Sequence, residues 1–316
     1  MKNKILIILI NLFFLLSFAQ SPNLEWQKTY GGTQTETANC IQQTSDGGYI
    51  VVGNTSSING DVTLNQGQYD VWVVKLNSAG TIVWQNTFGG AQNDNATSVQ
   101  QTLDGGYIIA GSTVTSNGYD NFWIIKLNST GVIVWQNSIG GTDHETATSV
   151  QQTSDGGYIV GGYSYSNDGD ISINYGFYDC WVVKLSASGM IVWQKTLGGS
   201  GDDILNSIIQ TTDGGYIFAG QTNSNNGDVS GHIGYGDFWV VKLSALGTLV
   251  WQKTLGGTEQ DNATSIKQTS DGGFIIAGNT YSNNDDVTGN NGDLDRGIVK
   301  INATGINTRK KEEGEK

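Results

Sequence analysis

The sequence has a single proline and few charged residues, and both shortages exclude whole classes of protein. Charged residues make up 14% of its 316 residues, against about 25% in an average chain. Glycine is abundant at 45 residues, but a collagen-like chain also needs proline and a three-residue glycine period. An aromatic content of 10% with low charge also excludes an intrinsically disordered chain. Frequent Gly, Asn, Ser and Thr between short apolar runs instead predict many strands joined by many turns.

Cysteine, histidine and arginine are scarce as well. Cys40 and Cys180 fall in different units of the repeat described below, so both are predicted to be free, buried thiols. The formal net charge is −13, and Arg296 is the only arginine before the C-terminal tail. Such an acidic chain repels phosphate backbones, so we expect no nucleic-acid partner.

Long apolar runs are missing except at the N-terminus. Lys2 and Lys4 precede an apolar run that ends in small residues before Gln20, which predicts a secretory signal peptide over residues 1–19. No other run is long enough for a membrane span. We therefore expect a monomer that is secreted, extracellular or on the cell surface, with the periplasm as an alternative. Residues 309–316 are predicted to be a charged, disordered tail.

One unit recurs five times along the chain. The triplet Asp-Gly-Gly recurs at intervals of 58, 51, 58 and 58 residues, and two series of tryptophans follow the same intervals. The triplets begin at Asp46, Asp104, Asp155, Asp213 and Asp271. The first tryptophan series is Trp26, Trp84, Trp135, Trp193 and Trp251, and the second is Trp72, Trp123, Trp181 and Trp239. A repeat of this length indicates a solenoid, a propeller or an array.

Each unit is predicted to contain four strands joined by glycine-containing hairpin turns. The second and third strands are apolar at successive positions, so both of their faces must be covered, as in stacked sheets. These features predict an all-β, five-bladed β-propeller over residues 20–308, built of four-stranded antiparallel blades. The repeats start near residues 26, 84, 135, 193 and 251.

One spare fourth strand stands at the start of the chain, and one is missing at the end. Residues 24–30 have the sequence of a fourth strand, whereas residues 306–309 depart from it. We therefore expect the N-terminal strand to complete the last blade and close the ring, which would remove open sheet edges. The alternative is a truncated chain from a larger propeller.

The recurring pattern W-Q-K-T-x-G-G, D-G-G-Y-I-I-A-G and D-x-W-V-V-K-L-x-x-x-G-x-I-V-W resembles the repeat of secreted bacterial β-propeller-repeat proteins. The resemblance covers residues 24–305. It implies extracellular or cell-surface residence, and it implies no common activity. Many members carry a C-terminal sorting domain for type IX secretion, and these 316 residues contain none.

Residues present in every copy are most simply scaffold, whereas residues that break the repeat are free to function. The acid of each Asp-Gly-Gly turn is predicted to pair with the lysine of its own blade's third strand. These lysines are Lys75, Lys126, Lys184, Lys242 and Lys300. An acid that opens each third strand also counts as scaffold: Asp70, Asp120, Asp179, Asp237 and Asp295. The tryptophans are predicted to form the core between blades.

A further acid opens every first strand, and these acids offer a candidate metal site. They are Glu36, Asp94, Glu145, Asp203 and Asp261. A ring of five carboxylates near the axis would suit calcium. The alternative is that they only cap the strand starts, and no other cofactor is predicted.

Departures from the repeat cluster around the third and fourth blades. The second copy is seven residues short, and the third copy's loop between second and third strands is rich in aromatics. The predicted ligand-binding residues are Tyr165, Tyr175, Phe177, Tyr178, His232, Tyr235 and Asp170, with Tyr163 and His144 nearby. They would bind an extracellular glycan or protein. The alternative is that these aromatics only pack the longer loop onto its neighbour.

We predict no catalytic residues, and hence that the protein is not an enzyme. The sequence has no Gly-x-Ser-x-Gly, no phosphate-binding loop and no closely spaced histidines. A glycoside hydrolase needs two carboxylates, one with a raised pKa. Glu145, Asp170, Asp202 and Asp203 are the nearest candidates, but none is isolated in an apolar stretch. The alternatives to a binding protein are a polysaccharide-active hydrolase and a purely structural surface protein.

Overall fold

The computed structural model describes residues 23–290 and 292–304. The predicted signal peptide and the predicted tail lie outside the described residues. Every regular element in the described ranges is a β-strand, and none of these residues forms a helix that could cross a membrane.

The strands form five antiparallel sheets, which we call blades 1 to 5 in chain order. Blade 1 contains β1 (Glu36–Gln43), β2 (Tyr49–Thr55), β3 (Asp70–Leu76) and β4 (Ile82–Phe88). Blade 2 contains β5 (Asp94–Gln101), β6 (Tyr107–Val114), β7 (Asp120–Leu127) and β8 (Ile133–Ile139). Blade 3 contains β9 (Glu145–Gln152), β10 (Tyr158–Ser164), β11 (Asp179–Leu185) and β12 (Ile191–Leu197). Blade 4 contains β13 (Asp203–Gln210), β14 (Tyr216–Thr222), β15 (Asp237–Leu243) and β16 (Leu249–Leu255). Blade 5 contains β17 (Asp261–Gln268), β18 (Phe274–Thr280) and β19 (Asp295–Ile301).

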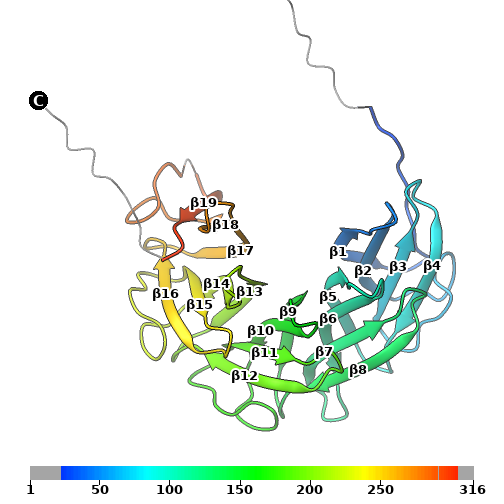
Figure 1. Ribbon diagram of the computed structural model, residues 1–316, viewed down its shortest axis with the longest axis horizontal. Coiled ribbons are helices and arrows are strands. Elements are labelled where there is room, and N and C mark those ends of the chain that lie inside the picture. The colour runs from blue at the N-terminus through cyan, green and yellow to red at the C-terminus, as the bar shows by residue number, and fades with distance from the viewer. Residues whose placement is uncertain (1–22, 291, 305–316) are drawn as a thin grey trace, which may run out of the picture.

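The five blades stand side by side in an arc (Figure 1). The first strand of each blade lines the inside of the arc, and the fourth strands β4, β8, β12 and β16 lie on the outside. The all-β prediction and the count of five repeating sheets are confirmed.

Blades stack on one another through apolar side chains of their middle strands. Phe122 of blade 2 meets Trp181 of blade 3 with ring centroids 4.6 Å apart, and both side chains are fully buried. The third-strand tryptophans therefore lie in the core, as predicted. The fourth-strand tryptophans are half-buried, and Trp135 contacts the edge of Tyr158 in the next blade at 5.7 Å.

Polar links join the inner strands of successive blades. Each inner strand carries a β-bulge, and in blades 1 to 4 the bulged residue turns its side chain to the next blade. Thr97 donates to the Ala147 carbonyl at 2.7 Å, and Thr148 donates to the Leu205 carbonyl at 2.6 Å. These links set the register between neighbouring blades.

The Asp-Gly-Gly turn of each blade holds a lysine, which is buried in blades 1 to 4 and exposed in blade 5. Gly156 adopts a φ of 81°, which the tight turn needs and which side chains disfavour. Asp155 of the same turn lies 3.0 Å from the Lys184 ammonium, and all five predicted Asp–Lys pairs are formed. Burial raises the pKa of Asp155, but hydrogen bonds from Thr153 and Lys184 outweigh burial and lower the pKa to about 2.

Both cysteines are free, as predicted. Cys180 is fully buried, whereas Cys40 is only half-buried because it lies on the inner strand of blade 1.

The predicted closure of the ring is not formed. Residues 24–30 form no strand and lie against blade 1, where the Trp26 ring contacts Tyr49 at 5.9 Å and its Nε1 donates to the Ser78 carbonyl at 3.1 Å. No described strand pairs with the outer edge of β19. Blades 1 and 5 therefore stand apart at the two ends of the arc (Figure 1).

Because the turn lysines differ in burial, we expect the loss of a turn aspartate to cost more stability in some blades than in others. Asp155→Ala should lower the free energy of unfolding by about 1–3 kcal/mol, because it leaves the buried Lys184 ammonium with the Leu185 carbonyl but without its carboxylate acceptor. Asp271→Ala should cost less, since the Lys300 side chain is 42% exposed against 4% for Lys184. Urea denaturation of both variants checks this, and equal losses would contradict the role of a buried cation.

Candidate functional site

A group of aromatic side chains gathers where β10 ends and β11 begins. We call Tyr163, Tyr165, Phe177 and Tyr178 the aromatic cluster. The ring centroids of Tyr178 lie 5.2 Å from Tyr163 and 5.1 Å from Tyr165, and Phe177 lies 6.3 Å from Tyr165. Tyr165 is 38% exposed and Phe177 55% exposed, so the cluster presents aromatic surface to solvent.

Carboxylates border the aromatic cluster. Burial, and after it the neighbouring Tyr163, Asp143 and Asp202, raises the pKa of the Tyr178 phenol. Asp202 also accepts a hydrogen bond from the Tyr178 backbone N–H at 3.3 Å. Asp143 and Asp202 are half-buried and belong to loops before β9 and β13. Sequence reasoning missed Asp143, because nothing in the repeat indicates its proximity to Tyr178.

A histidine–carboxylate pair lies next to the cluster. His144 Nδ1 is 3.1 Å from Asp120 Oδ2, and the His144 ring contacts Tyr119 at a centroid distance of 4.9 Å. The Tyr165 backbone N–H donates to the His144 carbonyl at 2.9 Å, which ties this pair to the cluster. Blade 2 has only a short turn here, Thr115–Tyr119, in place of the longer loops of the other blades.

Asp120 does not occupy the repeated acid position that its spacing predicts. In blade 2, the position of the repeated acid is occupied by Asn121, which directly precedes Phe122 as Asp179 directly precedes Cys180 in blade 3. Asp120 lies one residue earlier on β7. The scaffold assignment of Asp120 is therefore wrong: one extra residue frees it to pair with His144. A spacing in the sequence could have revealed this. Asp120 stands three residues before Trp123, whereas Asp179 stands two residues before Trp181.

The other predicted ligand-binding residues lie outside the aromatic cluster. Tyr175 precedes β11 and is 43% exposed, and its backbone N–H donates to Asp179. Asp170 is exposed and accepts from the Gly140 backbone N–H at 3.1 Å. His232 and Tyr235 belong to the loop of blade 4. Burial lowers the pKa of His232, and Tyr235 is exposed.

The five acids of the predicted calcium ring are placed between blades and do not converge on the axis. Asp94, Glu145, Asp203 and Asp261 are buried, and Glu36 of blade 1 is half-buried. Asp261, for example, accepts from the Ser282 hydroxyl at 2.8 Å and the Gly257 N–H at 2.9 Å. Within residues 23–290 and 292–304, no three acid, histidine or cysteine side chains are grouped so as to hold a metal ion. The described residues therefore show no shared site for these five acids, and calcium binding stays a prediction.

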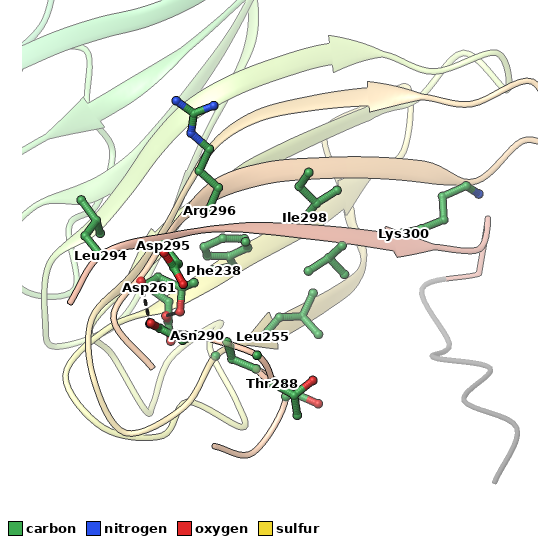
Figure 2. A pocket seen from close by; sticks show the side chains of 17 residues that line it. Phe238, Leu255, Asp261, Thr288, Asn290, Leu294, Asp295, Arg296, Ile298 and Lys300 are labelled. Carbon is green, nitrogen blue, oxygen red and sulfur yellow. Dashed lines mark hydrogen bonds between the residues drawn. The ribbon is translucent and has the colours of Figure 1, made fainter. Parts of the chain in front are cut away.

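A pocket of about 880 Å³ lies at the last blade, away from the aromatic cluster. Figure 2 shows it between β19 and the end of blade 4, lined by Leu255, Phe238 and Thr288. It is open because no described fourth strand covers β19. We take the pocket as a consequence of the missing strand rather than as a ligand site.

No known family model matches the chain, and no curated protein sequence matches it. Among solved structures, the chain is similar to a protein of unknown function from Dyadobacter fermentans. The identity is 12% over 89% of this chain and 79% of that chain, with a TM-score of 0.49. It is also similar to a GH43_1 enzyme from Xanthomonas citri, with 12% identity, coverage of 80% and 83%, and a TM-score of 0.42. A GH43 β-xylosidase/α-arabinofuranosidase from a compost microbial metagenome has 11% identity, coverage of 88% and 94%, and a TM-score of 0.41.

The prediction that the protein is not an enzyme is overturned. It assumed that no acid stands in an apolar setting, yet burial raises the pKa of Asp179 and of Asp237 to about 7. Several of the similar solved structures are also glycoside hydrolases. These findings remove the exclusion without assigning a reaction, because a fold hosts many functions and both acids are buried out of reach of a substrate.

Proposed function

We propose that the protein is an exported carbohydrate-binding protein of the β-propeller-repeat type, and that its aromatic cluster binds the sugar. The observation that supports this most is the exposed surface of Tyr165 and Phe177 beside Asp143 and Asp202. Binding sites combine apolar and aromatic surface with a few oriented polar groups. Sugar rings offer both an apolar face for stacking and hydroxyls for carboxylates.

The position of the cluster also supports a binding role. Its residues break the repeat, whereas the repeated acids, lysines and tryptophans are occupied in turns and in the core. The short turn of blade 2 lowers the rim next to Tyr165, so a ligand has access from that side. His144 and Asp120 stand at the same rim and add a hydrogen-bonding pair for hydroxyls. Export is proposed from the N-terminal segment alone.

Binding should depend on the aromatic cluster and not on aromatic exposure in general. We expect glycan binding by the mature chain on a glycan array, and Tyr165→Ala should weaken it by about tenfold or more, equal to 1.4 kcal/mol. The matched control is Tyr281→Ala, because Tyr281 follows β18 just as Tyr165 follows β10 and is similarly exposed. No glycan binding, or equal loss in both variants, would contradict the proposal and favour a role in loop packing.

Hydrolysis of the bound polysaccharide is the second candidate. The observation in its favour is the pair of carboxylates at one aromatic surface, since glycoside hydrolysis uses two acids. Release of reducing sugar by the mature chain, abolished by Asp143→Asn or Asp202→Asn, would establish it. Of the four candidates from the sequence, Glu145 and Asp203 are too deeply buried to take part, and their conservative variants serve as stability controls. Turnover that survives both substitutions would rule this pair out.

A further inference from the structure

An acid faces an acid at three of the four junctions between blades. The third-strand acid of one blade stands opposite the first-strand acid of the next. The pairs are Asp70 with Asp94, Asp179 with Asp203, and Asp237 with Asp261. A Cβ on Gly198 would lie 2.2 Å from Asp179 Oδ1 and 2.6 Å from Asp203 Oδ2, so both oxygens border one small space. Gly89 and Gly256 stand between the other two pairs in the same way.

In the pairs Asp179–Asp203 and Asp237–Asp261 the two acids differ in hydrogen bonding, whereas Asp70 and Asp94 each accept one backbone N–H. Asp203 accepts from the Thr222 hydroxyl on one oxygen and from the Ser224 hydroxyl and the Gly199 N–H on the other, at 2.7 and 2.8 Å. Burial raises the pKa of Asp203, and these three donors oppose that rise by favouring the ionised form. Asp179 accepts only from the Tyr175 N–H at 2.6 Å, on Oδ2. Its Oδ1 is buried without a partner, and the same holds for Oδ1 of Asp70 and of Asp237.

The described charged groups that act on Asp70, Asp179 and Asp237 are all carboxylates. The charged groups that act on Asp179 are Asp203 and Asp228, and Asp202 acts in turn on Asp203. Those that act on Asp237 are Asp261, Asp285 and Asp286, and Asp94 acts on Asp70. The Cys180 thiol lies beside Asp179 and is fully buried. Two ionised carboxylates in such a space repel each other strongly.

The fourth junction shows what the position requires. There Asn121 replaces the third-strand acid and faces Glu145, with Gly140 between them. A Cβ on Gly140 would lie 3.0 Å from Asn121 Nδ2 and 2.4 Å from Glu145 Oε2. An amide has the shape of a protonated carboxyl group and is neutral, and its N–H₂ is a donor. The chain therefore already contains the neutral form of this junction.

We propose that Asp70, Asp179 and Asp237 are proton-binding sites, and that each holds a proton on Oδ1 and donates it to Oδ2 of the facing acid. The proton satisfies the one oxygen that lacks a partner and leaves a single negative charge in each pair. Loss of the proton puts two charges into the junction and weakens the stacking of blades. The proposal is independent of the carbohydrate-binding role.

The direction of the pH dependence follows from the shifted groups. Burial is the main cause that raises the pKa of Asp179 and of Asp237 to about 7, and neighbouring carboxylates raise each further. Burial also raises the pKa of Asp70, and of the facing acids Asp203 and Glu145, which act in the same direction. An acid whose folded pKa lies above its unfolded value of about 3.9 stabilises the fold fully only below that value. The stability is lost progressively as pH rises from about 4 through about 7. Burial lowers the pKa of His232, so this residue makes stability rise with pH instead. The effect of each substitution is therefore measured against the parent at the same pH.

The test is urea unfolding of the full mature chain between pH 5 and pH 8, without calcium and with calcium chloride. For the parent, we expect the unfolding constant to rise with pH by up to about tenfold per pH unit for each site that releases its proton. Asp179→Asn with Asp237→Asn should remove most of this rise and make the protein more stable than the parent at pH 8. The reverse change, Asn121→Asp, should steepen the rise.

Two results would overturn the proposal. One is a pH dependence that is the same in the parent, the double variant and Asn121→Asp. The other is calcium that stabilises the parent at pH 8 but not the double variant, which would mean that the junctions hold a cation in place of the proton. If the double variant does not fold, Asn121→Asp still decides between the outcomes.

Discussion

Each blade buries the side chains of one face against the next blade, and the whole arc depends on that stacking. At the junction of blades 2 and 3, Phe122 and Trp181 are fully buried. Burying a side chain of this size stabilises a protein by about 1.5–3 kcal/mol. Bulged threonines add hydrogen bonds between inner strands. A blade alone has two apolar faces and would not be stable, so stability must accumulate from junction to junction.

The two ends of the arc show how the chain treats a blade face that no described neighbour covers. No described blade precedes blade 1, and Tyr30 packs against the surface around Trp72 and Val74 that a preceding blade would cover. No blade follows blade 5 in the part of the chain that the structure describes, and its Ile298 is 71% exposed. Arg296 stands there at the position where Phe238 of blade 4 faces its neighbour. A charged residue on an open sheet face discourages uncontrolled association.

Features that depend on one turn or one strand could be predicted from the sequence. The Asp155–Lys184 pair and the burial of Trp181 follow from turn chemistry and from apolar runs. Features that depend on how blades lie against each other could not. The acid Asp203 marks a strand start in the sequence, but only the packing shows that it faces Asp179 and not the axis. Closure failed for the same reason, because it depends on the angle between blades.

The candidate site was predicted in part, because its aromatics break the repeat. Tyr165, Phe177 and Tyr178 come together as a group, whereas Tyr235 and His232 lie on the loop of another blade. The pair of Asp120 and His144 was missed because the extra residue before Asn121 hides a one-residue shift. A one-residue change of register in a strand moves a side chain to the other face, and spacing alone does not show it.

Hydrogen exchange of backbone amides in the native protein tests the central claim, an open arc in which no described strand covers the outer edge of β19. An open arc predicts that the outward amides of β19 exchange much faster than those of β15, which pairs with strands on both sides. Amides of β19 that are protected as strongly as those of β15 would contradict it, because a fourth strand would then cover that edge.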